Sequence, residues 1–209
     1  MSAEAFPVRR LVVERLGCRR GGRLIFSDLS FTLASGEAVA LTGRNGAGKS
    51  SLIAMICGRL RPDTGTVGCE REGSSEDDAP LPELLHHLGH REGLKSALTA
   101  RENLDTAQAL LGESDLSVGA ALDRVGLPHV ADLPVGYLSA GQRRRVALAR
   151  LLVARRPFWL LDEPAAALDT ASQQMLCGLM NAHLAEGGAI LAATHGPLGI
   201  AAREVRIGA

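Results

Sequence analysis

Aromatic side chains are scarce in this sequence. Of its 209 residues, one is tryptophan, one is tyrosine and four are phenylalanine, so aromatic residues make up 3%. The core must therefore be built mainly from aliphatic side chains. Hydrophobic residues reach 46%, which indicates a folded globular chain and not a disordered one. The length is enough for one good core, with room for a subdomain.

Excess charge and long apolar runs are also missing. Lysine plus arginine number 23 and aspartate plus glutamate number 23, so the formal net charge is zero. Nucleic acid is therefore not expected as a partner, because binding it usually needs an excess of basic charge. No run of about 18 apolar residues is present to form a transmembrane helix, and residues 1–7 lack a signal-peptide core. We expect a cytoplasmic chain that acts on a membrane only through a partner.

Paired cysteines are absent as well. The sequence contains four cysteines, far apart and without a Cys-x-x-Cys pair: Cys18, Cys57, Cys69 and Cys177. This spacing predicts buried, small hydrophobic side chains in a reducing compartment.

One glycine-rich stretch stands out among the residues that are present. It fits the pattern Gly-x4-Gly-Lys-Ser of a phosphate-binding P-loop, and its residues are Gly43, Arg44, Asn45, Gly46, Ala47, Gly48, Lys49 and Ser50, with Ser51 following. An apolar run precedes it and a helical run follows, which is the context that the motif requires. The glycines let backbone N–H groups converge on phosphate oxygens, and a lysine and a serine supply a charge and a Mg²⁺ ligand. A glycine-rich turn matched by chance is the weaker interpretation.

Apolar and alternating runs predict the strands. We expect them at residues 8–16, 24–33, 38–42, 84–88, 158–161, 189–194 and 203–207. Residues 17–23 are expected to form a turn, and the acidic residues 70–82 an exposed connector.

Helices are predicted mainly in the middle of the chain. Thr99 begins a capping box, Thr-Ala-Arg-Glu, which opens a helix ending near residue 111. Further helices are expected at residues 51–56, at 118–125, after Ser139 and, capped by Thr170, up to residue 185. Residues 92–156 therefore form a mainly helical segment. The strand at residues 158–161 is apolar throughout, as expected for a sheet that is covered on both faces.

Two carboxylates end that buried strand. Asp162 and Glu163 follow Leu160 and Leu161, which is the Walker B arrangement. Asp162 is expected to hold Mg²⁺ opposite Ser50, and Glu163 to polarise the water that attacks the γ-phosphate. An ordinary acidic strand end is the alternative, which an upstream P-loop disfavours.

A further short motif lies at the start of the helix predicted after Ser139. It consists of Leu138, Ser139, Ala140, Gly141 and Gln142. Ser139 is a good helix N-cap, and a capped helix start is itself a phosphate site.

Together these motifs resemble the nucleotide-binding subunits of ABC transporters over essentially the whole chain. Residues 138–142 stand for the signature, residues 167–169 for the D-loop and residues 194–195 for the switch histidine. The resemblance implies an α/β fold: a P-loop NTPase core with a mixed sheet flanked by helices, an antiparallel β portion and a helical signature subdomain. It implies one domain over residues 1–209, with the core at about 1–91 and 157–209 and the helical subdomain at about 92–156.

The resemblance also implies a mechanism that needs two copies. Two subunits pair head to tail, and each ATP, with Mg²⁺, lies between one P-loop and the other copy's signature. Ser139 and the Gly141 N–H would then meet the γ-phosphate, with Ala140 and Gln142 beside them. His195 would sense that phosphate, and Asp169 would couple the two sites. Lys49, Glu163 and His195 are the implied catalytic residues.

Two positions depart from the family pattern. Arg20 stands where an aromatic residue would stack on adenine, and its planar guanidinium can stack there instead. His90 stands where the Q-loop has glutamine, which brings pH sensitivity near Mg²⁺. His86, His87 and His90 also suggest a metal site, but alternation on a strand turns His87 away from the other two, so His90 as the Q-loop substitute is preferred.

Residues 89–95, 98–104 and 138–151 resemble more narrowly the ATP-binding subunits of cytochrome c maturation, or haem exporter, systems. That resemblance implies a peripheral ATPase on the cytoplasmic face of the inner membrane. Its partner would be the integral subunit CcmB, with CcmC and CcmD in the same complex. An ABC exporter for another cargo, such as a drug or a lipid, is the alternative. Soluble ABC proteins of translation or DNA repair, and P-loop kinases, fit the single cassette and the signature less well.

Overall fold

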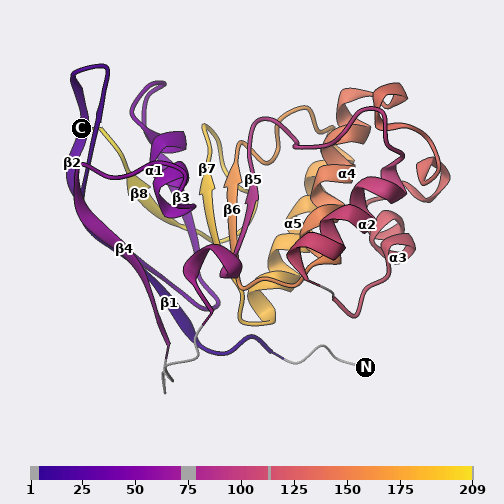
Figure 1. The fold of residues 1–209 in the computed structure, drawn as a ribbon, viewed down its shortest axis with the longest axis horizontal. Coiled ribbons are helices and arrows are strands. Elements are labelled where there is room, and N and C mark those ends of the chain that lie inside the picture. Colours follow the sequence, from indigo (N-terminus) through magenta and orange to yellow (C-terminus); the bar gives the residue numbers. More distant parts are fainter. Residues whose placement is uncertain (1–4, 72–78, 113, 209) are drawn as a thin grey trace.

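Two β-sheets and a group of helices form the molecule (Figure 1). The structure is a computed structural model that describes residues 5–71, 79–112 and 114–208. The first sheet is antiparallel, with strand order β2-β1-β4. The second is parallel, with strand order β5-β6-β7-β3-β8. The predicted α/β class is confirmed, and its mixed strand directions are divided between two separate sheets.

Strands β1 to β3 precede the first helix, and α2 to α4 follow one another between β5 and β6. The strands are β1 (Arg9–Arg20), β2 (Arg23–Ala34), β3 (Ala38–Thr42), β4 (Thr64–Arg71), β5 (Leu85–Leu88), β6 (Phe158–Asp162), β7 (Ala189–Ala193) and β8 (Arg203–Arg206). The α-helices are α1 (Lys49–Ile56), α2 (Ala100–Leu111), α3 (Val118–Arg124), α4 (Ala140–Val153) and α5 (Thr170–Ala185). Short 3-10 helices lie at Leu81–Leu84, Pro128–Val130 and Val135–Tyr137.

The parallel sheet is buried on both faces and separates two hydrophobic clusters. In β6, Phe158 and Leu160 pack into the cluster that contains α1 and the antiparallel sheet. Trp159 and Leu161 point the other way, into the cluster formed with α2, α3, α4 and α5. Figure 1 shows the same arrangement, with α1 and α4 on opposite sides of the parallel strands. The apolar strand predicted at residues 158–161 is thus confirmed, as is its coverage on both faces.

The first hairpin is longer than predicted. Its turn is only Gly21 and Gly22, both at positive φ, and not residues 17–23. Gly17 instead lies inside β1, where an added Cβ would be 2.5 Å from Thr64 Oγ1. The glycine that looked like a turn residue therefore permits the close approach of β4.

Strand β4 was not predicted, and its last two residues fall in the connector expected at residues 70–82. It pairs antiparallel with β1, opposite Leu11 and Val13. Its own sequence has two glycines and only two partly buried apolar side chains, so its pairing comes from β1 and not from local preference. Of the predicted connector, residues 72–78 lie outside the described residues.

The starts of α2, α3 and α4 were predicted correctly, whereas α1 begins at Lys49, two residues before the predicted run. Thr99 and Glu102 form a complete capping box at α2. Helix α5 is capped by Asp169, whose side chain accepts from the Ser172 N–H at 2.8 Å. The prediction of Thr170 as the cap was therefore wrong by one position, since Thr170 is already the first helical residue.

Two predictions from composition have different outcomes. Among the described residues, no helix is long and apolar enough to cross a membrane. All four cysteines are free, but only Cys18 is buried, and the other three are partly exposed. The expectation of four buried cysteines was therefore wrong for Cys57, Cys69 and Cys177.

Candidate functional site

The predicted site residues gather at the carboxyl ends of the parallel strands. Strand β3 leads into the P-loop, β6 ends at Asp162, and β7 is followed by Thr194 and His195. This edge is where ligands bind in open parallel sheets. A hollow of about 520 Å³ lies there, lined partly by Gly43 and His195.

Close packing fixes the path of the P-loop. An added Cβ at Gly43 would lie 2.4 Å from the Ile207 carbonyl oxygen, and one at Gly48 would lie 2.5 Å from Ile25 Cγ2. Both glycines have positive φ, 142° and 103°. Between them, Arg44, Asn45 and Gly46 are exposed and Ala47 is half-buried. Helix α1 begins after Gly48 without a side-chain cap, so its first N–H groups face the loop.

Lys49 is held inside this loop. Its side chain is 8% exposed, and Nζ donates to the Gly43 carbonyl at 2.8 Å and to the Arg44 carbonyl at 3.5 Å. His195 Nε2 lies 3.4 Å from the same ammonium. The charge is thus fixed between the P-loop and the end of β7.

Ser50 and Asp162 meet across the sheet edge. The Ser50 hydroxyl donates to Asp162 Oδ2 at 2.8 Å. A hydroxyl and a carboxylate form the oxygen pair that Mg²⁺ prefers when phosphates supply further ligands, so these residues fit that ion. Ser51, next along, is half-buried and hydrogen-bonds the Cys18 thiol in β1, so it lies on the protein side of the loop.

Glu163 has a strained backbone. Its φ is 48°, a left-handed conformation that costs a non-glycine residue about 1–3 kcal/mol and is found mainly at functional sites. Its N–H donates to the Ala193 carbonyl at 2.9 Å. Carboxylate Oε1 is enclosed, and no donor from the described residues bonds it; His195 Nε2 is the near neighbour, at 3.7 Å. The oxygen is thus an available acceptor beside the P-loop.

Arg144 was missed by the sequence analysis. It is the fifth residue of α4 and is 3% exposed. Its guanidinium donates to the carbonyls of Asp162 at 3.1 Å, Glu163 at 2.6 Å, Pro164 at 3.3 Å and Gly89 at 2.9 Å. Burial lowers its pKa, while nearby carboxylates, Glu92 first, raise it. The available signal was an arginine on the apolar face of the helix, in line with the buried Ala147, Leu148 and Leu151.

The signature residues form a complete helix cap. Ser139 accepts from the Gln142 N–H at 3.2 Å, and the Gln142 side chain accepts from the Ser139 N–H at 2.8 Å. This confirms the predicted N-cap. Ser139 and Ala140 are exposed, and an added Cβ at Gly141 would lie 3.2 Å from the Ala167 carbonyl. The structure therefore does not bring this helix start to the P-loop of the same chain, because α1 and α4 lie on opposite sides of the sheet (Figure 1).

Asp169 lies two residues after Ala167, and its carboxylate bonds within its own chain. Its carboxylate caps α5, and the Ser172 N–H lowers its pKa. The signature and this aspartate are thus joined through the packing of Gly141 on Ala167.

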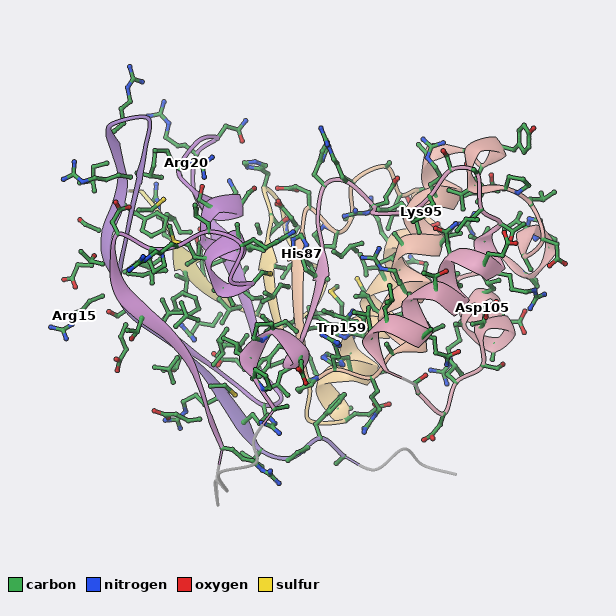
Figure 2. The ribbon with its side chains drawn as sticks, viewed as in Figure 1. Arg15, Arg20, His87, Lys95, Asp105 and Trp159 are labelled. Carbon is green, nitrogen blue, oxygen red and sulfur yellow. The ribbon has the colours of Figure 1, made fainter. Side chains whose placement is uncertain are left out.

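The two departures from the family pattern lie at the margins. Arg20 is exposed at the end of β1, on the hairpin whose Ile25 and Phe26 contact Gly48 (Figure 2). His90 is exposed in the bend that follows β5. Neither side chain touches the P-loop in the described contacts.

The other histidines of the predicted trio have different surroundings. His86 is buried, and its Nε2 donates to the Ala154 carbonyl at 2.7 Å; burial lowers its pKa to about 3. Burial also lowers the pKa of His87 to about 4, with Arg59 adding to the effect. Among the described residues, no group of three or more histidine, cysteine or acidic side chains is arranged to hold a metal ion.

A second cavity lies away from these motifs. It measures about 510 Å³ and is lined in part by Phe6, Arg155, Trp159 and His183. Trp159 lies in the first half of β6, far from its carboxyl end (Figure 2). Trp159 stacks on His183 at 4.0 Å and Arg155 covers Phe6 at 4.0 Å. This cavity therefore lies apart from the phosphate chemistry.

Comparisons with known proteins agree with this geometry. The ABC transporter family model matches residues 26–166, more than half of the chain. The cytochrome c biogenesis ATP-binding export protein CcmA of Rhodopseudomonas palustris strain BisB5 is 55% identical over 93% of this chain and 96% of its own length. The CcmA protein of Bradyrhizobium diazoefficiens strain USDA 110 is 53% identical over 93% of this chain and 96% of its own length.

Solved structures are similar over the same range. An ATP-binding subunit of an ABC transporter superposes with a TM-score of 0.78 at 28% identity, covering 88% of this chain and 79% of that chain. A bacterial Atm1-family ABC exporter with ATP bound gives a TM-score of 0.79 at 25% identity, covering 99% of this chain and 38% of that longer chain. The chain therefore belongs to the ATP-binding proteins of the ABC transporter family and, within them, to the cytochrome c biogenesis ATP-binding export proteins.

Proposed function

We propose that this chain is the ATP-hydrolysing subunit of an ABC transporter complex that serves cytochrome c maturation. The observation that carries the proposal is the convergence of two groups at one sheet edge. Ser50 lies 2.8 Å from Asp162, and His195 lies 3.4 Å from Lys49 and 3.7 Å from Glu163. Two relatives are more than half identical to this chain over nearly its full length, and both are named as cytochrome c biogenesis proteins. Their names support the link to cytochrome c.

The P-loop residues 43–51 bind the triphosphate. Backbone N–H groups of the loop and of the uncapped start of α1 donate to phosphate oxygens, and Lys49 adds a fixed positive charge. Ser50 and Asp162 would hold Mg²⁺, which neutralises phosphate charge when it is bound. Arg20 lies on the hairpin beside the loop and offers its guanidinium plane to the base.

Glu163 acts as the general base. Its side chain is 31% exposed and Oε1 accepts no hydrogen bond from the described protein groups, so the carboxylate can accept the proton of a water aligned with the γ-phosphate. His195 lies between Glu163 and Lys49, where it contacts the γ-phosphate and reports its loss. His90, in the bend after β5, takes the place of the Q-loop glutamine.

The site is completed by a second copy of the chain. The capped start of α4 is exposed at Ser139 and Ala140, and α4 lies on the other side of the parallel strands from α1 (Figure 1). In a head-to-tail dimer, Ser139, Ala140, Gly141 and Gln142 of one copy meet the γ-phosphate held by the other. Asp169, packed behind the signature, couples the two sites.

The partners and the domain division follow from the same proposal. The chain is one nucleotide-binding domain with a core at about residues 1–91 and 157–209 and a helical subdomain at about 92–156. It attaches at the cytoplasmic face of the inner membrane to an integral subunit like CcmB, together with subunits like CcmC and CcmD. ATP binding closes the dimer and hydrolysis opens it, which gives the membrane subunits a two-state input.

Two experiments test the proposal. Glu163→Gln should bind ATP, hydrolyse it slowly and accumulate as a dimer on a sizing column; a variant that stays monomeric and turns over normally would refute the assignment of the base. Deleting the gene should remove covalent haem from c-type cytochromes, seen by haem staining of a gel. Unchanged staining, in a cell without a second maturation system, would refute the link to cytochrome c.

A further inference from the structure

Arg144 joins three separate segments of the molecule. It belongs to α4, the helix that the signature caps, and it reaches both the turn after β6 and the end of β5. Among the described residues, its guanidinium donates only to backbone carbonyls, those of Gly89, Asp162, Glu163 and Pro164. Such bonds hold backbone and leave the neighbouring carboxylates free for other work.

We propose that Arg144 is a positioning residue for ATP hydrolysis: its guanidinium holds the left-handed backbone of Glu163 and makes the place of that carboxylate depend on how α4 is seated. The inference rests on the proposed function, because it takes Glu163 as the base.

The strained backbone is the first reason. A glutamate at φ 48° persists only where its surroundings over-determine it. The Glu163 N–H is held by Ala193, and its carbonyl accepts from Arg144 at 2.6 Å. The peptide groups on both sides of Cα are thus fixed, one by β7 and the other by the signature helix.

The position of Gly89 is the second reason. It immediately precedes His90, and its carbonyl shares the guanidinium with the turn after β6. A movement of α4 or of the bend at His90 therefore changes the bonds that hold Glu163. A planar fork with five donors suits this junction, because an ammonium cannot reach all four carbonyls at once.

Arg156 provides a matched control. It too is an arginine that clamps carbonyls of separate segments, donating to Leu111 at 3.1 Å, Pro82 at 2.9 Å and Leu85 at 3.0 Å. Burial lowers its pKa, as it does for Arg144. Among the described residues, Arg156 bonds none that belongs to the P-loop, the turn after β6 or the signature.

The experiment measures kcat and KM for ATP in the assembled transporter complex. Arg144→Gln should lower kcat by about 10- to 100-fold with KM within about threefold, because only the alignment of the base is lost. Arg144→Lys should recover only part of that loss. Arg156→Gln should lower the melting temperature about as much and keep kcat within about twofold.

A double-mutant cycle with Glu163→Gln separates positioning from a general structural role. In the Glu163→Gln background, Arg144→Gln should cause no further loss of kcat, because a missing base has no position to lose. Additive losses, or an equal loss of kcat in Arg156→Gln, would overturn the inference. If Arg144→Gln does not fold, Arg144→Lys enters the same cycle. Normal turnover by Glu163→Gln alone would instead refute the proposed function.

Discussion

Helices α1 and α4 both begin at a motif that we propose as a phosphate site, but the two helix starts are built differently. Helix α1 follows Gly48 and has no side-chain cap. Helix α4 has a complete capping box between Ser139 and Gln142. Both motifs contain glycine. The two helices differ in whether a side chain of the same chain accepts hydrogen bonds from the first helical N–H groups.

The difference teaches what each helix start can do alone. The uncapped start of α1 leaves donors for an anion, and the rigid loop around Lys49 holds them in place. The capped start of α4 is satisfied within its own chain and can be presented as a finished surface. The start of α1, with the P-loop, is suited to be the fixed half of a site, because its N–H groups need a ligand. The start of α4 is suited to be the docking half, because its N–H groups need none.

The largest effect should come from Lys49→Ala, which removes the charge from the fixed half. Lys49 is 8% exposed and held by two carbonyls of its own loop. Its loss should lower ATP turnover by at least about 100-fold. A coupled phosphate-release assay measures this, and turnover near the wild-type rate would show that the P-loop assignment is wrong.

The next effect concerns the end of α4, and it depends on pH. Burial lowers the pKa of His86 to about 3, and its Nε2 holds the Ala154 carbonyl just after α4. The folded histidine stays neutral, whereas the unfolded chain takes up a proton below about pH 6.5. The contribution of neutral His86 to the free energy of unfolding is therefore fully present above that pH. It is lost as the pH falls toward the folded pKa.

From pH 8 to pH 5 we expect His86 to remove about 2 kcal/mol of unfolding free energy. Burial lowers the pKa of His183 to about 4, so it should contribute a loss of the same sign. Urea unfolding at both pH values measures the change. His86→Gln keeps a donor for Ala154 and should show a smaller loss; a loss equal to that of the wild-type chain would contradict this account.

A smaller effect should distinguish the caps of two helices. Ser139→Ala and Thr99→Ala each break a complete capping box, at α4 and α2. Each should cost about 1 kcal/mol of stability. Only Ser139→Ala should also slow ATP turnover, by about tenfold, because the proposed function gives its hydroxyl a second contact, with the γ-phosphate. Equal turnover in the two variants would reduce the signature serine to a helix cap.

The smallest effect should come from Arg20, beside the fixed half. It is exposed on the β1–β2 hairpin. Arg20→Tyr should tighten ATP binding by about fivefold, since an aromatic ring adds a stacking face worth about 1 kcal/mol. Calorimetric titration with ATP and with GTP would show it, and no change for either nucleotide would place the base elsewhere.

Local patterns in the sequence predicted the capping box at Thr99, the N-cap Ser139 and the buried strand β6, because a few adjacent residues determine them. Residues that depend on distant contacts were misread or missed. Gly17 looked like a turn residue but admits β4, and β4 lacks an apolar pattern of its own. The apolar face of α4 marks Arg144 as a buried residue, but its partners, the carbonyls of Gly89 and of the turn after β6, are distant in the sequence. The single-chain geometry also separates α1 from α4, which spacing alone cannot predict.

The central claim is that the two halves of one site come from two copies. It is tested most directly by mixing Lys49→Ala chains with Ser139→Arg chains, each inactive alone. Random pairing gives mixed dimers in which one site has an intact P-loop and an intact signature, so turnover should return to about a quarter of the wild-type value. If the mixture stays as inactive as its components, the sites are not shared between copies.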